Sequence, residues 1–395
     1  MPRTYPIILL AAGQTLAWAT LYYVFPALLL RWEQETGWSK AELTAAITLA
    51  VLVSALAAPL AGRLIDRGHG AAMMGGSAAL GGLAVIALAT ATELWQFYTL
   101  WALIGLTFAG CLYEPCFALV TRARGANAKP AIILITLAAG FASTLSFPIV
   151  NGLAEAYGWR LAVATTGAVA VFVVAPLLWF GTRALDREGT ADEPKDAAPE
   201  TANRHAFLRR PEFWFLAFGF ALGAVVHGAT LHHLLPYLDE KGLSNDMAVL
   251  VASFIGPMQV AGRLAMMASE RAISTHGVAI AAFLLLGLSV FLLLIGGSSP
   301  TALVGFVVFF GGAYGTVSII RPIIARDVLG GRNFGAKSGA LALPYLVGSA
   351  TAPYLGALVW GVGGYNLMLA ILVVLAALGC VLYLIARRLA RRPAP

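Results

Sequence analysis

The feature that most constrains this chain is a series of apolar stretches, each close to the ~20 residues that a helix needs to cross a membrane. The 395 residues are 59% hydrophobic and 11% charged, whereas an ordinary soluble domain has about 25% charged residues. This pattern excludes a water-soluble fold and predicts an all-α membrane protein. The first stretch, from about Tyr5 to Leu30, is too long for the core of a signal peptide, so we expect it to remain as a span.

Polar or turn-rich breaks divide the chain into twelve predicted transmembrane helices. They fall near residues 31–40, 66–70, 92–95, 122–130, 157–160, 181–211, 239–246, 269–277, 298–300, 327–337 and 361–364. The sixth break is the longest and mixes acidic with basic residues, which is typical of a solvated linker. We therefore predict a six-helix bundle over residues 1–182, a cytoplasmic linker over 183–210 and a second six-helix bundle over 211–395.

The distribution of basic residues predicts the orientation of the helices. If the N-terminus is cytoplasmic, all of the 26 lysines and arginines fall on the inner side except Arg31, Lys40, Arg160 and Lys241. By the positive-inside rule, both termini are expected in the cytoplasm of a multi-pass protein of the plasma membrane. The net charge of +7 therefore does not indicate a nucleic-acid partner.

The two halves of the sequence repeat each other. Residues 19–28 (ATLYYVFPAL) match residues 229–238 (ATLHHLLPYL), and Pro148 pairs with Pro353 at a similar offset. Several matches at nearly constant offset indicate a six-plus-six duplication. Parallel repeats related by an axis along the membrane normal are a known transporter architecture, so we expect two pseudo-symmetric bundles.

Arg263 is the sharpest candidate for a substrate-binding residue. It lies eight residues before Arg271, the expected cytoplasmic end of the eighth helix, and therefore about 12 Å deeper. An arginine at that depth costs roughly 2.5–3.5 kcal/mol and usually faces a polar cavity or a partner. Its planar fork suits a carboxylate. In the alternative interpretation it is a helix-end charge that snorkels to the interface.

Glu114 and Arg321 each precede a proline at equivalent depth in the fourth and tenth predicted helices. One interpretation is a salt bridge that closes the cytoplasmic mouth and breaks when the two halves move. In a second interpretation Glu114 carries the coupling proton. The third is that both residues snorkel to the membrane surface.

Three of the six histidines, His227, His232 and His233, lie in the seventh predicted helix. The pair His232-His233 occupies the place of Tyr22-Tyr23 in the first half, so one member of each pair is expected to face a central cavity. Because histidine titrates near physiological pH, a role in proton sensing is possible. The alternative is that the two histidines cap the outer end of this helix.

The whole chain resembles the major facilitator superfamily. The segment Gly62-Arg63-Leu64-Ile65-Asp66-Arg67-Gly68 is similar to the signature between helices 2 and 3 of that family, which places Asp66 and Arg67 in a gating loop. Further residues resemble the branch of monocarboxylate and oxalate/formate transporters. They are Tyr23-Val24-Phe25-Pro26, Pro115, Tyr157-Gly158-Trp159-Arg160, and Gln259 four residues before Arg263.

That branch associates the helix 8 arginine with the substrate carboxylate, which implies the same role for Arg263. Its eukaryotic members carry a lysine directly after the helix 1 proline and an aspartate four residues before the arginine. This chain has Ala27 and Gln259 at those places. The remaining cavity is expected to be shaped by Gln259, Tyr22, Tyr23, Tyr113, His232 and His233.

We therefore expect a secondary active transporter that moves a small organic anion, a monocarboxylate coupled to protons, by alternating access. The alternative is an efflux exporter of drugs or hydrophobic metabolites, which the absence of the helix 1 lysine favours and the buried arginine disfavours. No catalytic or metal-binding constellation is recognisable, so we expect that the protein is not an enzyme and has no cofactor. We also expect a monomer. The four residues Trp32, Trp38, Trp95 and Trp159 are expected in an outer interfacial belt.

Overall fold

The computed structural model describes residues 4–124, 128–188, 206–269, 272–330 and 334–390. All regular secondary structure in these ranges is helical. The chain forms two compact units, unit 1 (Met1–Asp196) and unit 2 (Ala197–Pro395), and each is described by itself. The central part of the predicted linker lies outside the described residues.

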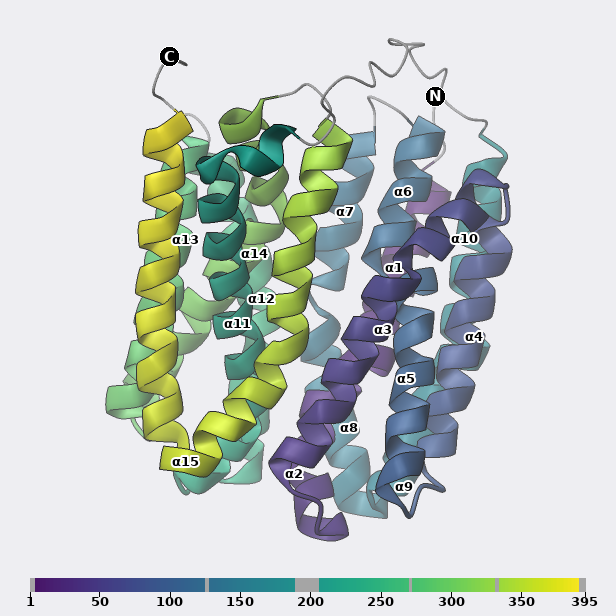
Figure 1. Cartoon of the computed structure of the whole chain (residues 1–395). Coiled ribbons are helices and arrows are strands. Elements are labelled where there is room, and N and C mark those ends of the chain that lie inside the picture. Colours follow the sequence, from purple (N-terminus) through teal and green to yellow (C-terminus); the bar gives the residue numbers. More distant parts are fainter. Residues whose placement is uncertain (1–3, 125–127, 189–205, 270–271, 331–333, 391–395) are drawn as a thin grey trace. The chain divides into compact units, whose positions relative to one another are not determined.

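Unit 1 contains a series of helices, several of which join end to end within one span (Figure 1). The α-helices are α1 (Tyr5–Ala17), α2 (Val24–Thr36), α3 (Lys40–Asp66), α4 (Gly70–Leu88), α5 (Leu94–Cys111), α6 (Tyr113–Arg124), α7 (Ala128–Ala139), α8 (Ala142–Tyr157), α9 (Trp159–Val169) and α10 (Ala175–Asp186). Two π-helical turns, η1 (Trp18–Tyr22) and η3 (Ala170–Val174), connect α1 to α2 and α9 to α10.

Local sequence explains where the second span of unit 1 begins. Gly37 ends α2 with a φ of 75°, a conformation that glycine adopts at little cost. Ser39 then caps α3: its hydroxyl accepts a hydrogen bond from the Glu42 backbone N–H, and the Glu42 carboxylate accepts one from the Ser39 backbone N–H. This reciprocal capping box satisfies two N–H groups that the first turn of a helix leaves without partners.

The described part of unit 2 has one short helix followed by five longer ones, of which the last is broken inside. They are the short η4 (Ala206–Arg209), α11 (Pro211–Glu240), α12 (Asn245–Ser269), α13 (Thr275–Gly296), α14 (Pro300–Leu329) and α15 (Phe334–Ala390). The last helix is broken inside at Gly363 and Gly364, where Gly364 has a φ of 67°, and Figure 1 shows that α15 turns back there. This break coincides with the predicted one at 361–364.

Eleven helical stretches in the described residues are long and apolar enough to cross a membrane. The last of them, Ala340–Ala390, has 51 residues, which is more than twice the length of one crossing. The all-α membrane fold is therefore confirmed, whereas the count of twelve spans, the two bundle boundaries and the cytoplasmic termini stay predictions.

Each unit has a close helix crossing in which glycine removes the side chain that would separate the backbones. In unit 1, a Cβ at Gly105 on α5 would lie 2.1 Å from the Ala50 carbonyl oxygen on α3. In unit 2, a Cβ at Gly311 on α14 would lie 2.7 Å from the Ile255 carbonyl oxygen on α12. The two crossings occupy equivalent positions in the sequence repeat, which supports the duplication.

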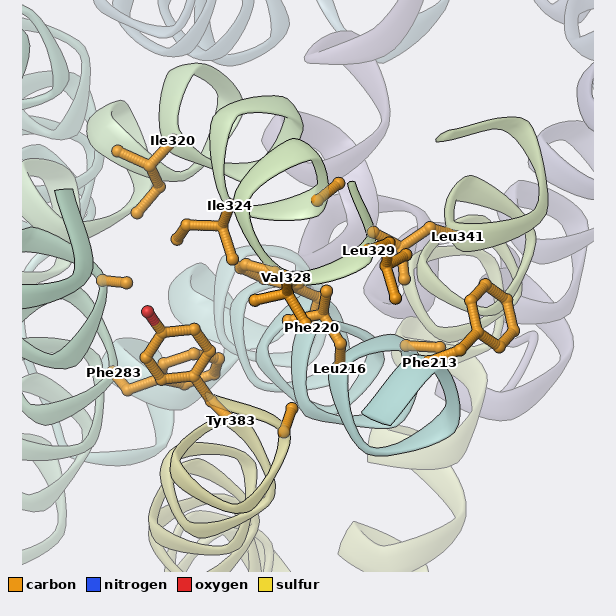
Figure 2. Packing of buried hydrophobic residues seen from close by; sticks show 14 of the residues in the cluster. Phe213, Leu216, Phe220, Phe283, Ile320, Ile324, Val328, Leu329, Leu341 and Tyr383 are labelled. Carbon is orange, nitrogen blue, oxygen red and sulfur yellow. The ribbon is translucent and has the colours of Figure 1, made fainter. Parts of the chain in front are cut away.

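One end of unit 2 has a core that ties η4 and α11 to the other helices (Figure 2). Phe213 and Phe220 from α11 pack there with Phe283 from α13, Ile324 from α14 and Tyr383 from α15. Burying an aromatic or aliphatic side chain in such a cluster gives many dispersion contacts, which drive packing where lipid is as apolar as the core.

The prediction of a tryptophan belt is wrong for two of its four members. Trp32 is completely buried and Trp159 is 1% exposed, whereas Trp95 is 66% exposed. The indole ring of Trp32 has edge-to-face contacts with Phe97, at 5.1 Å between centroids, and with Trp159, at 6.2 Å. Edge-to-face aromatic pairs stabilise a packed interior beyond their buried area, so these two rings hold helices together.

Candidate functional site

Arg263 is buried inside unit 2 between α12 and α14. Its side chain is only 4% exposed although it lies within the span Asn245–Ser269. Its Nε donates a hydrogen bond to the Gly315 carbonyl oxygen on α14, with a donor–acceptor distance of 2.9 Å. This contact holds the guanidinium against the neighbouring helix.

Gln259 lies one helical turn before Arg263, on the same face of α12. It is 4% exposed, and its amide nitrogen has no hydrogen-bond partner among the described residues. A buried amide without a partner costs free energy, which is a reason to expect a ligand or water there. The Arg263 guanidinium and the Gln259 amide N–H group lie one turn apart and are both hydrogen-bond donors, so together they could bind an anion.

Glycines on both α12 and α14 bring the two helices close enough for this geometry. A Cβ at Gly315 would lie 2.2 Å from the Gln259 carbonyl oxygen, and one at Gly262 would lie 2.4 Å from the Gly312 carbonyl oxygen. Any side chain larger than hydrogen at Gly315 would push the helices apart. The glycines therefore fix the distance over which Arg263 reaches α14.

The three predicted histidines are buried on α11 and contact groups of their own unit. The His227 ring stacks on Tyr314 of α14 with 3.3 Å between centroids. Nδ1 of His232 is 2.8 Å from the Gly228 carbonyl oxygen, and Nε2 of His233 is 2.8 Å from the Pro353 carbonyl oxygen on α15. The rings of His227 and His233 thus join α11 to α14 and α15, whereas this contact of His232 lies within α11 itself.

In unit 1, the predicted tyrosines gather around the π-helical turn η1. Trp18 contacts both Tyr22 and Tyr113, with centroid distances of 5.0 and 4.9 Å. Tyr23 is buried, whereas Tyr22 and Tyr113 are half-buried. The Ser146 hydroxyl of α8 donates to the Ala19 carbonyl oxygen of this turn, at 2.8 Å. A π-helical turn often marks a functional position in a helix.

Sequence reasoning missed Gln14, a fully buried residue of α1. Its Nε2 donates to the Cys111 carbonyl oxygen at 2.7 Å. Pro115, four residues after Cys111, has no N–H group that could donate to the Cys111 carbonyl oxygen. The helix also breaks at Leu112, between α5 and α6. Two features of the sequence could have indicated this contact. One is the single amide side chain of Gln14 in an apolar stretch, and the other is Pro115, which leaves the carbonyl one turn earlier without its usual donor.

Glu114 and Arg321 belong to different units. Glu114 is exposed and has no ion pair with any described residue. The Arg321 guanidinium lies over the Tyr345 ring, 4.0 Å from its centre. Their predicted salt bridge stays a prediction.

The predicted gating loop lies at the end of α3. Arg67 is exposed there, and the side chain of Asp66 lies outside the described residues. Arg122 of α6 donates to the Ile65 carbonyl oxygen, which joins α6 to the end of α3. Among the described residues, no group of three or more histidines, cysteines or acidic residues could hold a metal ion.

Comparison with known proteins places this arrangement in a family. The sequence model of the Major Facilitator Superfamily matches residues 10–280. Monocarboxylate transporter 12 of Xenopus laevis is 27% identical over 324 residues, which cover 74% of this chain and 68% of that protein. Monocarboxylate transporter 12-B of Danio rerio is 26% identical over 313 residues, which cover 70% of this chain and 65% of that protein.

Solved structures share the fold. A bacterial homologue of the human lysosomal transporter Spinster has a TM-score of 0.74 at 16% identity, with both chains fully covered. The nucleoside transporter NupG has a TM-score of 0.71 at 12% identity, covering 98% of this chain and all of the other. These matches confirm the predicted resemblance and point to a membrane transporter and not to an enzyme. The chain belongs to the Major Facilitator Superfamily.

Proposed function

We propose that this transporter moves a small organic anion, a monocarboxylate, and that Arg263 binds its carboxylate. The observation that carries the proposal is a guanidinium only 4% exposed, held by the Gly315 carbonyl within a membrane span. A side chain that snorkels to the membrane surface would be exposed, and this one is not. A buried arginine in a span usually serves a substrate or ion pathway.

The neighbouring amide strengthens this assignment. Gln259 presents a buried N–H group without a partner in the described part of the chain, one turn from Arg263. A carboxylate has two oxygens and about four lone-pair positions, so it accepts from a guanidinium and an amide together. The relatives named monocarboxylate transporter 12 support the same substrate class.

Transport is proposed to use alternating access and to be coupled to protons. Glu114 is an exposed carboxylate inside the span Leu94–Arg124, and a carboxylate at such a place faces water in order to avoid the cost of burial in lipid. It is the proposed proton carrier, and the buried histidines of α11 are the second candidates. The protein is proposed to act as a monomer in the plasma membrane with cytoplasmic termini.

Paired carboxylates and amides provide the direct test of the anion class. Purified protein would be melted with acetate, lactate or benzoate and, in parallel, with acetamide, lactamide or benzamide. We expect at least one acid to raise the melting temperature and its amide to have no effect, because only the acid carries the charge that Arg263 recognises. Arg263→Gln is expected to abolish the shift, whereas the exposed Arg326 provides the matched control Arg326→Gln.

The opposite pattern would overturn the proposal. Stabilisation by the hydrophobic amide alone, unchanged in Arg263→Gln, would favour the exporter of hydrophobic compounds. An acid shift that survives Arg263→Gln and is lost in Arg326→Gln would move the anion site to the end of α14.

A further inference from the structure

One end of unit 2 holds a buried histidine that contacts α15 on both sides of its break. The break at Gly363 and Gly364 divides this helix into a first arm and a second arm, which turns back (Figure 1). His233 of α11 is completely buried. Its Nε2 is 2.8 Å from the Pro353 carbonyl oxygen of the first arm, and its Nδ1 is 3.5 Å from the Tyr365 hydroxyl of the second arm. One ring thus contacts both arms.

The two neighbours determine where the hydrogen of the neutral His233 ring lies. A carbonyl oxygen only accepts hydrogen bonds, so Nε2 carries the hydrogen that it donates to Pro353. Nδ1 of the neutral ring then has a lone pair, which accepts the Tyr365 O–H group. At 3.5 Å this second bond is the weaker one. The hydrogen bonds therefore run in one direction, from the second arm through α11 to the first arm.

Close packing holds the His233 ring and the turn of α11 that follows it. A Cβ at Gly356 of the first arm would lie 2.9 Å from Nε2 of the ring, so a larger residue there would displace it. Tyr237, one turn after His233, packs edge to face on Tyr365 with 5.6 Å between the ring centroids. Its hydroxyl donates to the Leu293 carbonyl oxygen of α13. This turn of α11 is thus held by α13 and by the second arm.

Two exposed contacts attach the end of α11 to the same two arms. The indole N–H of Trp360 in the first arm donates to the Glu240 carboxylate at 3.1 Å. Lys241 donates through Nζ to the side-chain oxygen of Asn366 in the second arm at 3.2 Å. Exposed polar contacts of this kind contribute little by themselves. They show that the arrangement made by the buried histidine continues to the end of the helix.

These contacts lie on both sides of Pro236, where α11 would otherwise bend most easily. Proline has no N–H group for the carbonyl one turn earlier and crowds that carbonyl, which is a common cause of helix kinks. His233 lies three residues before Pro236 and Tyr237 directly after it, yet the helix continues without interruption over Pro211–Glu240. A bend at Pro236 would have to break the contacts on one side of it.

We propose that His233 acts as a clasp that prevents bending of α11 at Pro236, so that this part of α11 and the two arms of α15 move as one rigid body. Such a body is a cooperative unit, in which loss of one contact loosens every segment that it joins. The movement rests on the proposed alternating access, in which unit 2 then changes around this body and not within it. The clasp itself involves neither Arg263 nor Gln259.

Hydrogen–deuterium exchange of the whole chain in dodecyl maltoside, without any substrate, tests the clasp. The segments to follow are residues 229–240 of α11 and 361–368 of α15. His233→Phe keeps a ring but loses both hydrogen bonds, and it should accelerate exchange in both segments by about tenfold, the size expected for a lost buried hydrogen bond. Tyr365→Phe loses only the weaker bond and should accelerate the same segments by a smaller factor. Tyr354→Phe, which removes a half-buried hydroxyl beside Pro353, is the matched control and should leave both unchanged.

The pattern across the two segments decides the result. Faster exchange in residues 229–240 alone would show that His233 stabilises only its own helix and would overturn the clasp. Unchanged exchange of both segments in His233→Phe would overturn it as well. If His233→Phe does not fold, Tyr365→Phe provides the test, because it must loosen α11 although the substitution lies in α15. A failure of acid binding would contradict the role of Arg263 and leave these exchange rates unaffected.

Discussion

Single buried side chains stabilise the backbone where helices of this protein depart from regular geometry. Gln14 donates to the Cys111 carbonyl oxygen that Pro115 leaves without its usual donor. Ser146 donates to the Ala19 carbonyl oxygen within η1. In a membrane no water reaches such groups, so each must find a partner inside the protein. These contacts fix the irregular segments that present Tyr22 and Tyr113.

The first prediction at this scale concerns Gln14. Gln14→Leu keeps the volume but leaves the Cys111 carbonyl oxygen without a donor, which should cost about 1–3 kcal/mol. Unfolding of the purified protein by heat or SDS would measure the loss. Gln34→Leu, at an exposed position of α2, is the matched control and should change stability by less than about 0.5 kcal/mol. Equal effects of the two variants would show that the Cys111 contact does not stabilise the fold.

At the level of single residues, the sequence predicted a position only where one residue was informative by itself, as with the charged Arg263 in an apolar stretch. The depth of Arg263 was predicted from its distance to the helix end, and the structure shows this residue buried, while its role in substrate binding stays a prediction. The interior positions of Trp32 and Trp159 could not be predicted from sequence, because a tryptophan near a helix end is typical of both a membrane interface and a packed core. The contact of His233 with the Pro353 carbonyl joins residues 120 positions apart, which no local pattern reveals.

Helix pairs are held at short distance by glycines, and the substrate site depends on one such pair. Arg263 reaches the Gly315 carbonyl only because α12 and α14 touch at their backbones. The equivalent crossing of α3 and α5 in unit 1 has Gly105 against Ala50. Small residues at the contact are the main device by which membrane helices pack.

Two glycines of α14 provide a matched test at this scale. Gly315→Ala would place a methyl 2.2 Å from the Gln259 carbonyl oxygen, whereas a methyl at Gly312 meets nothing within 4 Å. We expect Gly315→Ala to lower stability by about 1–3 kcal/mol and to abolish the acid-dependent melting shift. Gly312→Ala should retain both properties. Acid binding by Gly315→Ala at the wild-type level would contradict the claim that the close crossing of α12 and α14 positions Arg263.

Element boundaries were the most predictable part of the fold. The predicted breaks at 31–40, 92–95, 157–160 and 361–364 contain helix ends or the break in α15, because glycine and capping residues mark them, although α2 continues to Thr36 within the first of these breaks. The π-helical turns η1 and η3 were not predicted. A π turn adds one residue and shifts the helical pattern, but the stretches around η1 and η3 are apolar on nearly every side, so the sequence carries little local trace of that shift.

The whole molecule consists of two related units, and its proposed cycle requires them to move against each other. The duplication was visible in sequence because residues 19–28 and 229–238 share a pattern, and the family match supports the corresponding fold. Substrate identity was not visible, since one fold serves many ligands. The specific claims therefore rest on charges inside spans: Arg263, Glu114 and Arg321.

Charge reversal tests the predicted salt bridge between Glu114 and Arg321. If Glu114 pairs with Arg321 and a histidine of α11 carries the proton, Glu114→Arg and Arg321→Glu should each reduce transport at least tenfold, and the double variant should restore most of it, because only a direct contact survives exchange of both signs. Uptake into proteoliposomes is the readout. A double variant that is no more active than the single ones would contradict the salt bridge.

The central claim is that Arg263 recognises the carboxylate of a transported anion. The most direct measurement is uptake, by proteoliposomes, of the acid that stabilises the protein most, with wild type, Arg263→Gln and Arg326→Gln compared at equal protein content. Wild type and Arg326→Gln should accumulate the acid, faster when the outside is acidic, and Arg263→Gln should fall to the level of empty liposomes. Uptake by Arg263→Gln at the wild-type rate would contradict the claim.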